Sequence, residues 1–209
     1  RWHEGLQDGS AGVSSWYASA TTAHPWQTAG GTAFPDVDSV VMSSGNTVNN
    51  TIGGAVSMRF DSAAQDWADG AVTRGLLIQP SGAIGSDAGF YSAEGAAAIS
   101  PFYSPKVVVT FAGGTGAVGS VPWTKPEKPL LKTYASVTSR PDTLRFRNGV
   151  NGYDSTYDTY INYWSPTGTF DGVPLYLDDT SATYPNKILI RFSNIIGSAA
   201  GQIPAGAII

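Results

Sequence analysis

Short segments in which apolar and polar residues alternate recur in the second half of the chain, and they predict β-strands. In residues 143–147, Leu144 and Phe146 share one face of the predicted strand. Its other face carries Thr143, Arg145 and Arg147. In residues 187–192 the predicted inner set is Ile188, Ile190 and Phe192, and the predicted outer set is Lys187, Leu189 and Arg191. A third strand is predicted over residues 157–164.

The first half contains apolar runs that predict further strands over residues 55–60, 76–78, 89–93 and 106–111. One short helix is expected over residues 62–69, with Asp61 or Ser62 as its N-cap and Gly70 as its end. Residues 1–54 are rich in loop-forming residues, and we expect loops anchored by Trp2, Trp16 and Trp26.

Composition strengthens the prediction of an all-β protein. Charged residues make up only 13% of the 209 residues, about half the usual share. Good helix formers are rare, whereas Gly, Thr, Tyr, Val and Ile are abundant. Hydrophobic residues make up 42%, which is enough for a packed core.

Charge and cysteine content exclude several classes of function. A net charge of -4 argues against a nucleic-acid partner, and no apolar run approaches the ~20 residues of a membrane span. Without cysteine the chain has no disulfide and no thiolate nucleophile or ligand. The balance of residues is typical of an extracellular or cell-surface protein. Because position 1 is Arg, we expect a processed or excised product.

Residues 112–132 divide the chain, because Pro122, Pro126 and Pro129 predict an extended linker there. The expected units are therefore a β-region over 1–111, the linker, and a second β-region over 133–209.

No motif predicts catalysis, so we expect a protein that is not an enzyme. The Gly-rich pattern at residues 114–119 follows a strand, but the prolines after it prevent the helix that a dinucleotide site needs. The two histidines, His3 and His24, stand in the loop-rich region without a recognisable partner. No cofactor is expected, although loop carboxylates leave room for a structural calcium ion. These are Asp36, Asp38, Asp154, Asp158, Asp171, Asp178 and Asp179.

Aromatic residues are the richer signal, with 6 Trp, 10 Tyr and 8 Phe. On the predicted strand 157–164, Tyr160, Asn162 and Trp164 share a face that would suit a sugar ring and its hydroxyl groups. Arg145 and Arg147, with the outward Lys187 and Arg191, would form a basic patch suited to acidic polysaccharide. Ordinary cross-strand packing and a solvated strand face are the alternative explanations.

Two ordered sets of short motifs carry a family resemblance. The first set is Phe60-Asp61, Trp67, Asp69-Gly70, Gly75-Leu76-Leu77-Ile78, Phe90-Tyr91-Ser92 with Glu94, and Pro105-Lys106-Val107-Val108-Val109. It resembles the C-terminal half of DNRLRE-type (disaggregatase-related) domains of secreted microbial proteins. The second set, similar to the N-terminal half of such a domain, is Leu144-Arg145-Phe146-Arg147, Gly149, Gly152-Tyr153, Asp158-Thr159-Tyr160-Ile161, Ile188-Leu189-Ile190-Arg191-Phe192, Ile203-Pro204 and Gly206-Ala207. The resemblance implies a jelly-roll-like antiparallel sandwich, similar to carbohydrate-binding modules.

The two halves stand in swapped order, and about two strands of such a domain are missing. We therefore expect a sandwich completed by strands of a neighbouring subunit, with copies of the chain joined head to tail into a filament or surface array. The residues predicted to make this assembly contact are Ile188, Ile190, Phe192, Ile203, Ile208 and Ile209. The alternative prediction is a carbohydrate-binding or adhesive module excised from a larger secreted protein.

Overall fold

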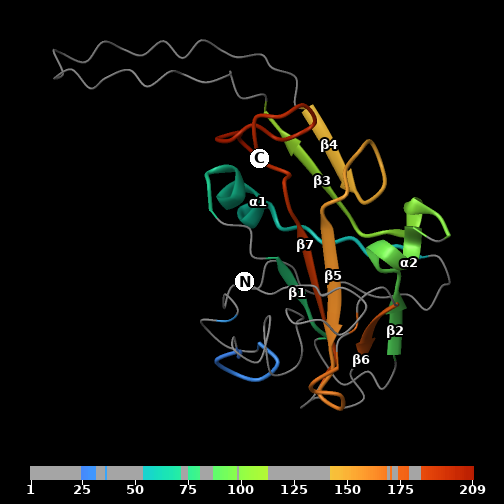
Figure 1. Cartoon of the computed structure of the whole chain (residues 1–209). Coiled ribbons are helices and arrows are strands. Elements are labelled where there is room, and N and C mark those ends of the chain that lie inside the picture. Colours follow the sequence, from blue (N-terminus) through green and yellow to red (C-terminus); the bar gives the residue numbers. More distant parts are fainter. Residues whose placement is uncertain are drawn as a thin grey trace, which may run out of the picture.

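The computed structural model describes residues 25–31, 36, 54–71, 75–80, 87–97, 99–112, 142–168, 170, 174–178 and 185–209 (Figure 1). Its strands are β1 (Leu76–Ile78), β2 (Asp87–Phe90), β3 (Lys106–Phe111), β4 (Asp142–Arg147), β5 (Thr156–Ile161), β6 (Leu175–Asp178) and β7 (Lys187–Phe192). Its helices are α1 (Asp61–Ala68), α2 (Ala93–Ala97) and the 3-10 turn η1 (Pro101–Tyr103).

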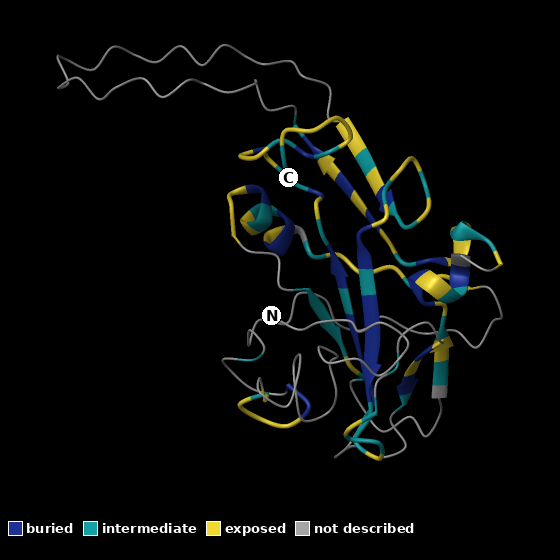
Figure 2. Cartoon of the chain, in the orientation of Figure 1, coloured by how far each residue is buried: buried dark blue, intermediate teal, exposed yellow. Residues whose placement is uncertain are grey.

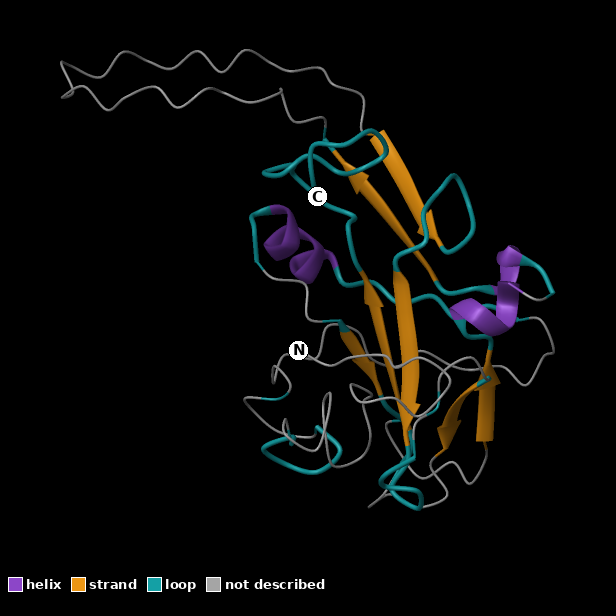
Figure 3. Cartoon of the chain, viewed as in Figure 1, coloured by secondary structure: helices purple, strands orange, loops and turns teal. Residues whose placement is uncertain are grey.

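The strands form three antiparallel sheets, with the orders β1-β7-β5, β2-β6 and β3-β4. The predicted all-β fold is therefore confirmed, and Figure 3 shows how little of the chain is helical. The jelly-roll order of strands stays a prediction.

Each sheet pairs a strand from the first half of the chain with at least one strand from the second half. Leu76 lies opposite Ile190, Ala88 opposite Leu177, and Val108 opposite Arg145. The regions 1–111 and 133–209 thus share all three sheets instead of forming separate units. The completion of the sandwich by strands of a neighbouring subunit stays a prediction.

Two apolar clusters lie around the central sheet β1-β7-β5, one on each face. On one face, β2 and β6 cover it, and the side chains between them include Tyr160, Leu175, Leu177 and Ile188. On the other face, Ile161 and Leu189 pack with Trp26 of the N-terminal segment. The strands β5 and β7 are therefore buried over most of their length, as Figure 2 shows.

A third cluster fills the space beneath β3 and β4. Val107, Val109, Phe111 and Phe146 point from the two strands onto Phe192, Ile195, Ile203 and Ala207 of the C-terminal part. Trp67 of α1 packs against the same cluster and lies 5.6 Å from the ring of Phe60. The C-terminal segment is held there by Gln65, whose side chain donates to the carbonyl of Ala207 and accepts from the amide of Ile209.

Several predicted elements need correction. Residues 54–60 form no strand, and the predicted strand 89–93 lies earlier, as β2, because α2 begins at Ala93. Helix α1 has Phe60 at its N-cap position, without a side-chain cap, so neither Asp61 nor Ser62 has the predicted role. Gly70 does end the helix, with a φ of 101° that favours glycine.

Candidate functional site

The β3-β4 pair has one buried and one exposed face. Along β3, exposed and buried residues alternate strictly, which places Lys106, Val108 and Thr110 on the outer face. The directly opposite residues of β4 are Arg147, Arg145 and Thr143. Three cations therefore gather on one solvent-facing surface, which we call the basic face. Arg145 is exposed and Arg147 half-buried.

Lys106 and Arg147 occupy directly opposed positions, an arrangement of like charges that weakens strand pairing. The guanidinium of Arg147 lies 5.4 Å from the centre of the Phe102 ring, a cation–π contact. Its Nε is buried without a hydrogen-bond partner, and so is the neighbouring Oδ1 of Asn148. The Nε donor of Arg147 and the Oδ1 acceptor of Asn148 thus both lie near one end of the basic face.

Exposed aromatic rings lie beside that end. Phe102 is 78% exposed, and the half-exposed rings of Tyr91 and Tyr103 lie 5.1 Å apart. The turn η1 holds Phe102 and Tyr103 in place, because Ser100 accepts a hydrogen bond from the Phe102 amide and Ser104 donates one to the carbonyl of Pro101. These three rings form what we call the aromatic ledge.

The predicted sugar-binding face of β5 does not form. The strand ends at Ile161, where the side chain of Asn162 accepts hydrogen bonds from the amides of Trp164 and Ser165 and so makes a turn. Tyr160 is only 7% exposed and stacks on Phe170 at 4.3 Å between ring centres. Trp164, which is 68% exposed, lies within that turn.

Most residues of the predicted assembly contact lie inside this chain's own core. Ile188, Ile203 and Phe192 are buried, and Ile190 packs against two of the clusters. The reason is that other parts of the same chain cover these residues: β2 and β6 pack on the central sheet, and β3 and β4 pack on Phe192 and Ile203. Ile209 is half-buried against the core, and Ile208 is exposed.

Lys187, Leu189 and Arg191 are buried, so the predicted outer face of β7 is wrong. Residues 25–31 supply the cover: the Nζ of Lys187 donates to the carbonyl of Gly30 at 3.1 Å. Burial lowers the pKa of Lys187 to about 8. The guanidinium of Arg191 lies 4.5 Å from the centre of the Tyr157 ring. Neither cation contributes to the basic face.

Asp158 is fully buried, and one of its oxygens accepts a hydrogen bond of 2.8 Å from the amide of Ala93. Burial first, and then the charge of Glu94, raise the pKa of this carboxyl to about 8 against the opposing effect of the hydrogen bond from Ala93. The carboxyl thus joins β5 to the start of α2, the segment that leads into the aromatic ledge.

Among the described residues, no three side chains of His, Asp or Glu converge as metal ligands would. Asp154 accepts a hydrogen bond from Ser155, and Asp36 accepts one from the amide of Thr28. Other predicted features lie outside the described residues. They are Trp2, His3, Trp16, His24, Asp38, residues 114–119, most of the linker 112–132, Asp171 and Asp179.

Comparison with known protein families, curated proteins and solved structures finds no match. The resemblance to DNRLRE-type domains stays a prediction. No helix in the described part of the chain has the length and apolar character that a membrane span requires.

Arg145 and Arg147 were found from the sequence, whereas Lys106, Phe102 and Tyr103 were missed. The apolar run at 106–111 predicted a strand without indicating its exposed face, and only the structure places Lys106 on the outer face opposite Arg147.

Proposed function

We propose that this protein is a non-catalytic module that binds an acidic polysaccharide through the basic face and the aromatic ledge. The observation that carries the proposal is the gathering of Lys106, Arg145 and Arg147 on one exposed sheet surface of a chain whose net charge is -4. The binding of such a polymer fits the extracellular location that the composition predicts.

The two kinds of residue match the two surfaces of a uronic acid. A guanidinium offers paired N–H donors in the geometry of a carboxylate, and a lysine adds a mobile positive charge. A sugar ring has a face of C–H groups that packs flat on an exposed aromatic ring, as Phe102 and Tyr103 provide. Cations and rings in adjacent positions therefore favour a sugar polymer with carboxylates over a simple anion.

The test is affinity electrophoresis in gels that contain polygalacturonate, with neutral dextran as reference. We expect Arg145→Gln to weaken binding about tenfold, because a hydrogen bond to a charged group contributes about 1.5–3 kcal/mol. Phe102→Ala should weaken binding by a smaller factor, since one aromatic contact contributes about 0.5–1.5 kcal/mol. Added salt should weaken binding to the polygalacturonate, because it screens exposed charges.

Trp164→Ala is the matched control, since it removes from the turn after β5 a ring that is 68% exposed, against 78% for Phe102. It should leave binding unchanged. Loss of binding in this variant with none in Arg145→Gln and Phe102→Ala would transfer the site to the turn. A wild-type protein that migrates alike in both gels would end the proposal.

A further inference from the structure

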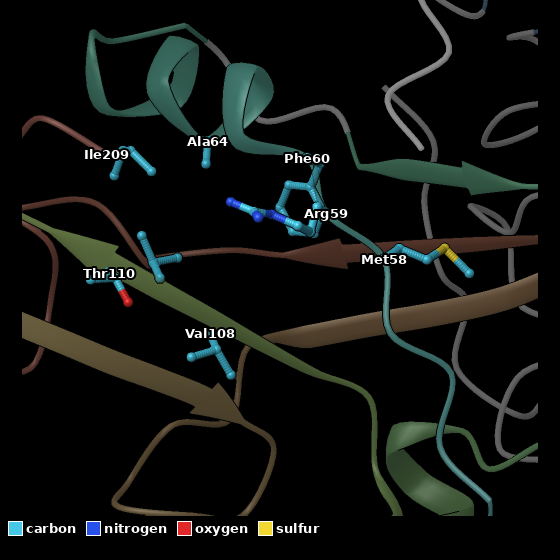
Figure 4. A pocket seen from close by; sticks show the side chains of 8 residues that line it. Met58, Arg59, Phe60, Ala64, Val108, Thr110 and Ile209 are labelled. Carbon is cyan, nitrogen blue, oxygen red and sulfur yellow. The ribbon is translucent and has the colours of Figure 1, made fainter. Parts of the chain in front are cut away.

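The loop between β4 and β5 contains two Asn-Gly pairs, Asn148-Gly149 and Asn151-Gly152. It begins directly after Arg147 of the basic face. A Cβ atom added to Gly149 would lie 3.8 Å from the Cβ of Pro101, so the loop also lies beside the turn η1. The groove of about 350 Å³ that β3 and Ile209 help to line lies apart from this loop (Figure 4). The loop therefore borders both the basic face and the aromatic ledge.

Asn151 and Gly152 are the two central residues of a tight hairpin turn. Their φ angles are 54° and 78°, and the amide of Tyr153 donates to the carbonyl of Val150 at 3.1 Å across an antiparallel bridge. Positive φ at both central positions is typical of a type I′ turn, in which Asn-Gly is the favoured pair. Both residues are exposed, so water reaches the side chain of Asn151.

The two Asn-Gly pairs differ in how firmly the fold holds them. The amide of Gly149 donates to the carbonyl of Tyr153 at 2.9 Å, whereas no acceptor in the described part of the chain pairs with the amide of Gly152. Asn148 is half-buried and its Oδ1 is shielded from solvent, whereas Asn151 is exposed. The fold therefore restrains the first pair and leaves the second accessible.

We propose that Asn151 is a site of spontaneous deamidation, in which the backbone nitrogen of Gly152 attacks the side-chain Cγ of Asn151. The nitrogen loses its proton and bonds to Cγ, the bond between Cγ and Nδ2 breaks, and ammonia leaves with that proton. Water then opens the cyclic imide at either of its carbonyls, which gives aspartate or isoaspartate at position 151. The sum is hydrolysis of an amide to a carboxylate and ammonium, with water as the only co-reactant.

The residue after the asparagine decides whether this attack is possible. Asparagine is a thermolabile residue, and a following glycine has no side chain to obstruct the approach of its nitrogen. Asn194 has the same left-handed backbone, with a φ of 58°, but the branched side chain of Ile195 follows it. The Nδ2 of Asn194 also donates to the Oγ of Ser155 at 3.3 Å. We therefore expect deamidation at Asn151 and none at Asn194.

Deamidation adds a negative charge beside the basic face. The amide of Val150 donates to the carbonyl of Arg147 at 3.2 Å, which folds the loop back toward the end of β4. A carboxylate at position 151 repels a polymer of uronic acids, because like charges across an interface oppose binding. The affinity for an acidic polysaccharide should therefore fall as the protein ages. This consequence rests on the proposed function, whereas the deamidation itself does not.

Mass spectrometry of the whole protein after incubation at mildly alkaline pH tests the inference. Trypsin cuts after Arg147, so both asparagines lie in one peptide, in which fragmentation distinguishes the two positions. Asn151 should deamidate about tenfold faster than Asn148, since the Gly149 amide must first break a hydrogen bond. The control is the same incubation in urea, where both asparagines should react at similar rates because glycine follows each.

Two results would overturn the inference. One is deamidation of Asn148 at least as fast as that of Asn151 in the folded protein. The other is a folded protein in which Asn151 stays intact under conditions that deamidate it in urea.

Asn151→Asp reproduces the charge of the product and tests the consequence for binding. It should bind polygalacturonate about threefold more weakly than the wild type at low salt and equally well at high salt, because the added charge is exposed. An unchanged affinity at low salt would contradict this consequence. The mass measurement needs no polysaccharide, so deamidation and polysaccharide binding fail separately.

Discussion

The strands β4 and β7 have nearly the same pattern, yet their cations lie in opposite environments. Both strands have an apolar inner face. On the opposite face, Arg145 of β4 is exposed, whereas Lys187 of β7 is only 2% exposed. The difference comes from the segment 25–31, which covers the second face of β7. Alternation in a strand thus identifies the two faces but not what covers each.

We expect the largest effect from pH, which should change the free energy of unfolding, because the ionisable side chains of Asp158 and Lys187 are buried in the central sheet. The carboxyl of Asp158 titrates near pH 8 in the folded chain and near pH 4 when unfolded, so the folded chain holds the extra proton between these values. Its contribution to stability is therefore present below about pH 4 and is lost as pH rises to about 8, a difference of up to about 5 kcal/mol.

Asp158→Asn isolates this effect, since it keeps an acceptor for the amide of Ala93 but cannot ionise. We expect thermal unfolding of the variant and the wild type to coincide near pH 4 and the variant to be more stable at pH 8. Lys187 acts with the opposite sign above pH 8, because the unfolded chain holds its proton up to about pH 10.4. Two curves that stay parallel from pH 4 to pH 8 would contradict the assignment for Asp158.

The next effect compares two aliphatic side chains. Leu189→Ala removes a buried side chain that packs with Trp26, and it should lower the free energy of unfolding by about 2–5 kcal/mol. Val108→Ala shortens a side chain that is 46% exposed on the outer face of β3. It should change the free energy of unfolding by less than about 0.5 kcal/mol. Urea denaturation measures both. Equal losses would mean that β3 and β7 are equally covered.

The smallest effect compares two arginines. Arg191→Gln removes a desolvated cation from the ring of Tyr157 and should cost about 2 kcal/mol of stability. Arg145→Gln should leave stability within about 0.5 kcal/mol of the wild type, because its side chain is exposed. The order should reverse for polygalacturonate binding, which only Arg145→Gln weakens. An Arg191→Gln variant that keeps its stability but loses binding would place Arg191 at the surface.

The alternating segments predicted the strands β4 and β7, and an apolar run predicted β3. Only in β4 did the alternation also identify the exposed face, because a half-buried strand imposes a period of two on its own sequence. The residues 143–147 and 106–111 lie within strands as expected, with Leu144 and Phe146 inward. The cover of β7 was not predictable, since Trp26 and Gly30 stand more than 150 residues from Lys187. The end of β5 was missed because Asn162 makes a turn within an otherwise aromatic, strand-like run.

The candidate site was predictable only in part for the same reason. Arg145 and Arg147 follow from one strand, but the site also needs Lys106 and Phe102, which reach it through the pairing of β3 with β4 and through the turn η1. A single sequence shows which residues share a strand face. It does not show which strands become neighbours.

The sharing of every sheet between the two halves of the chain has a kinetic consequence. No two of the described strands that pair are joined by a short turn: β3 and β4, for example, are joined only through the stretch between Phe111 and Asp142. Long loops must close before any of these strands can pair, and their closure costs chain entropy before packing stabilises the fold. We therefore expect slow folding compared with a protein built of hairpins, and a late, concerted docking of the two halves.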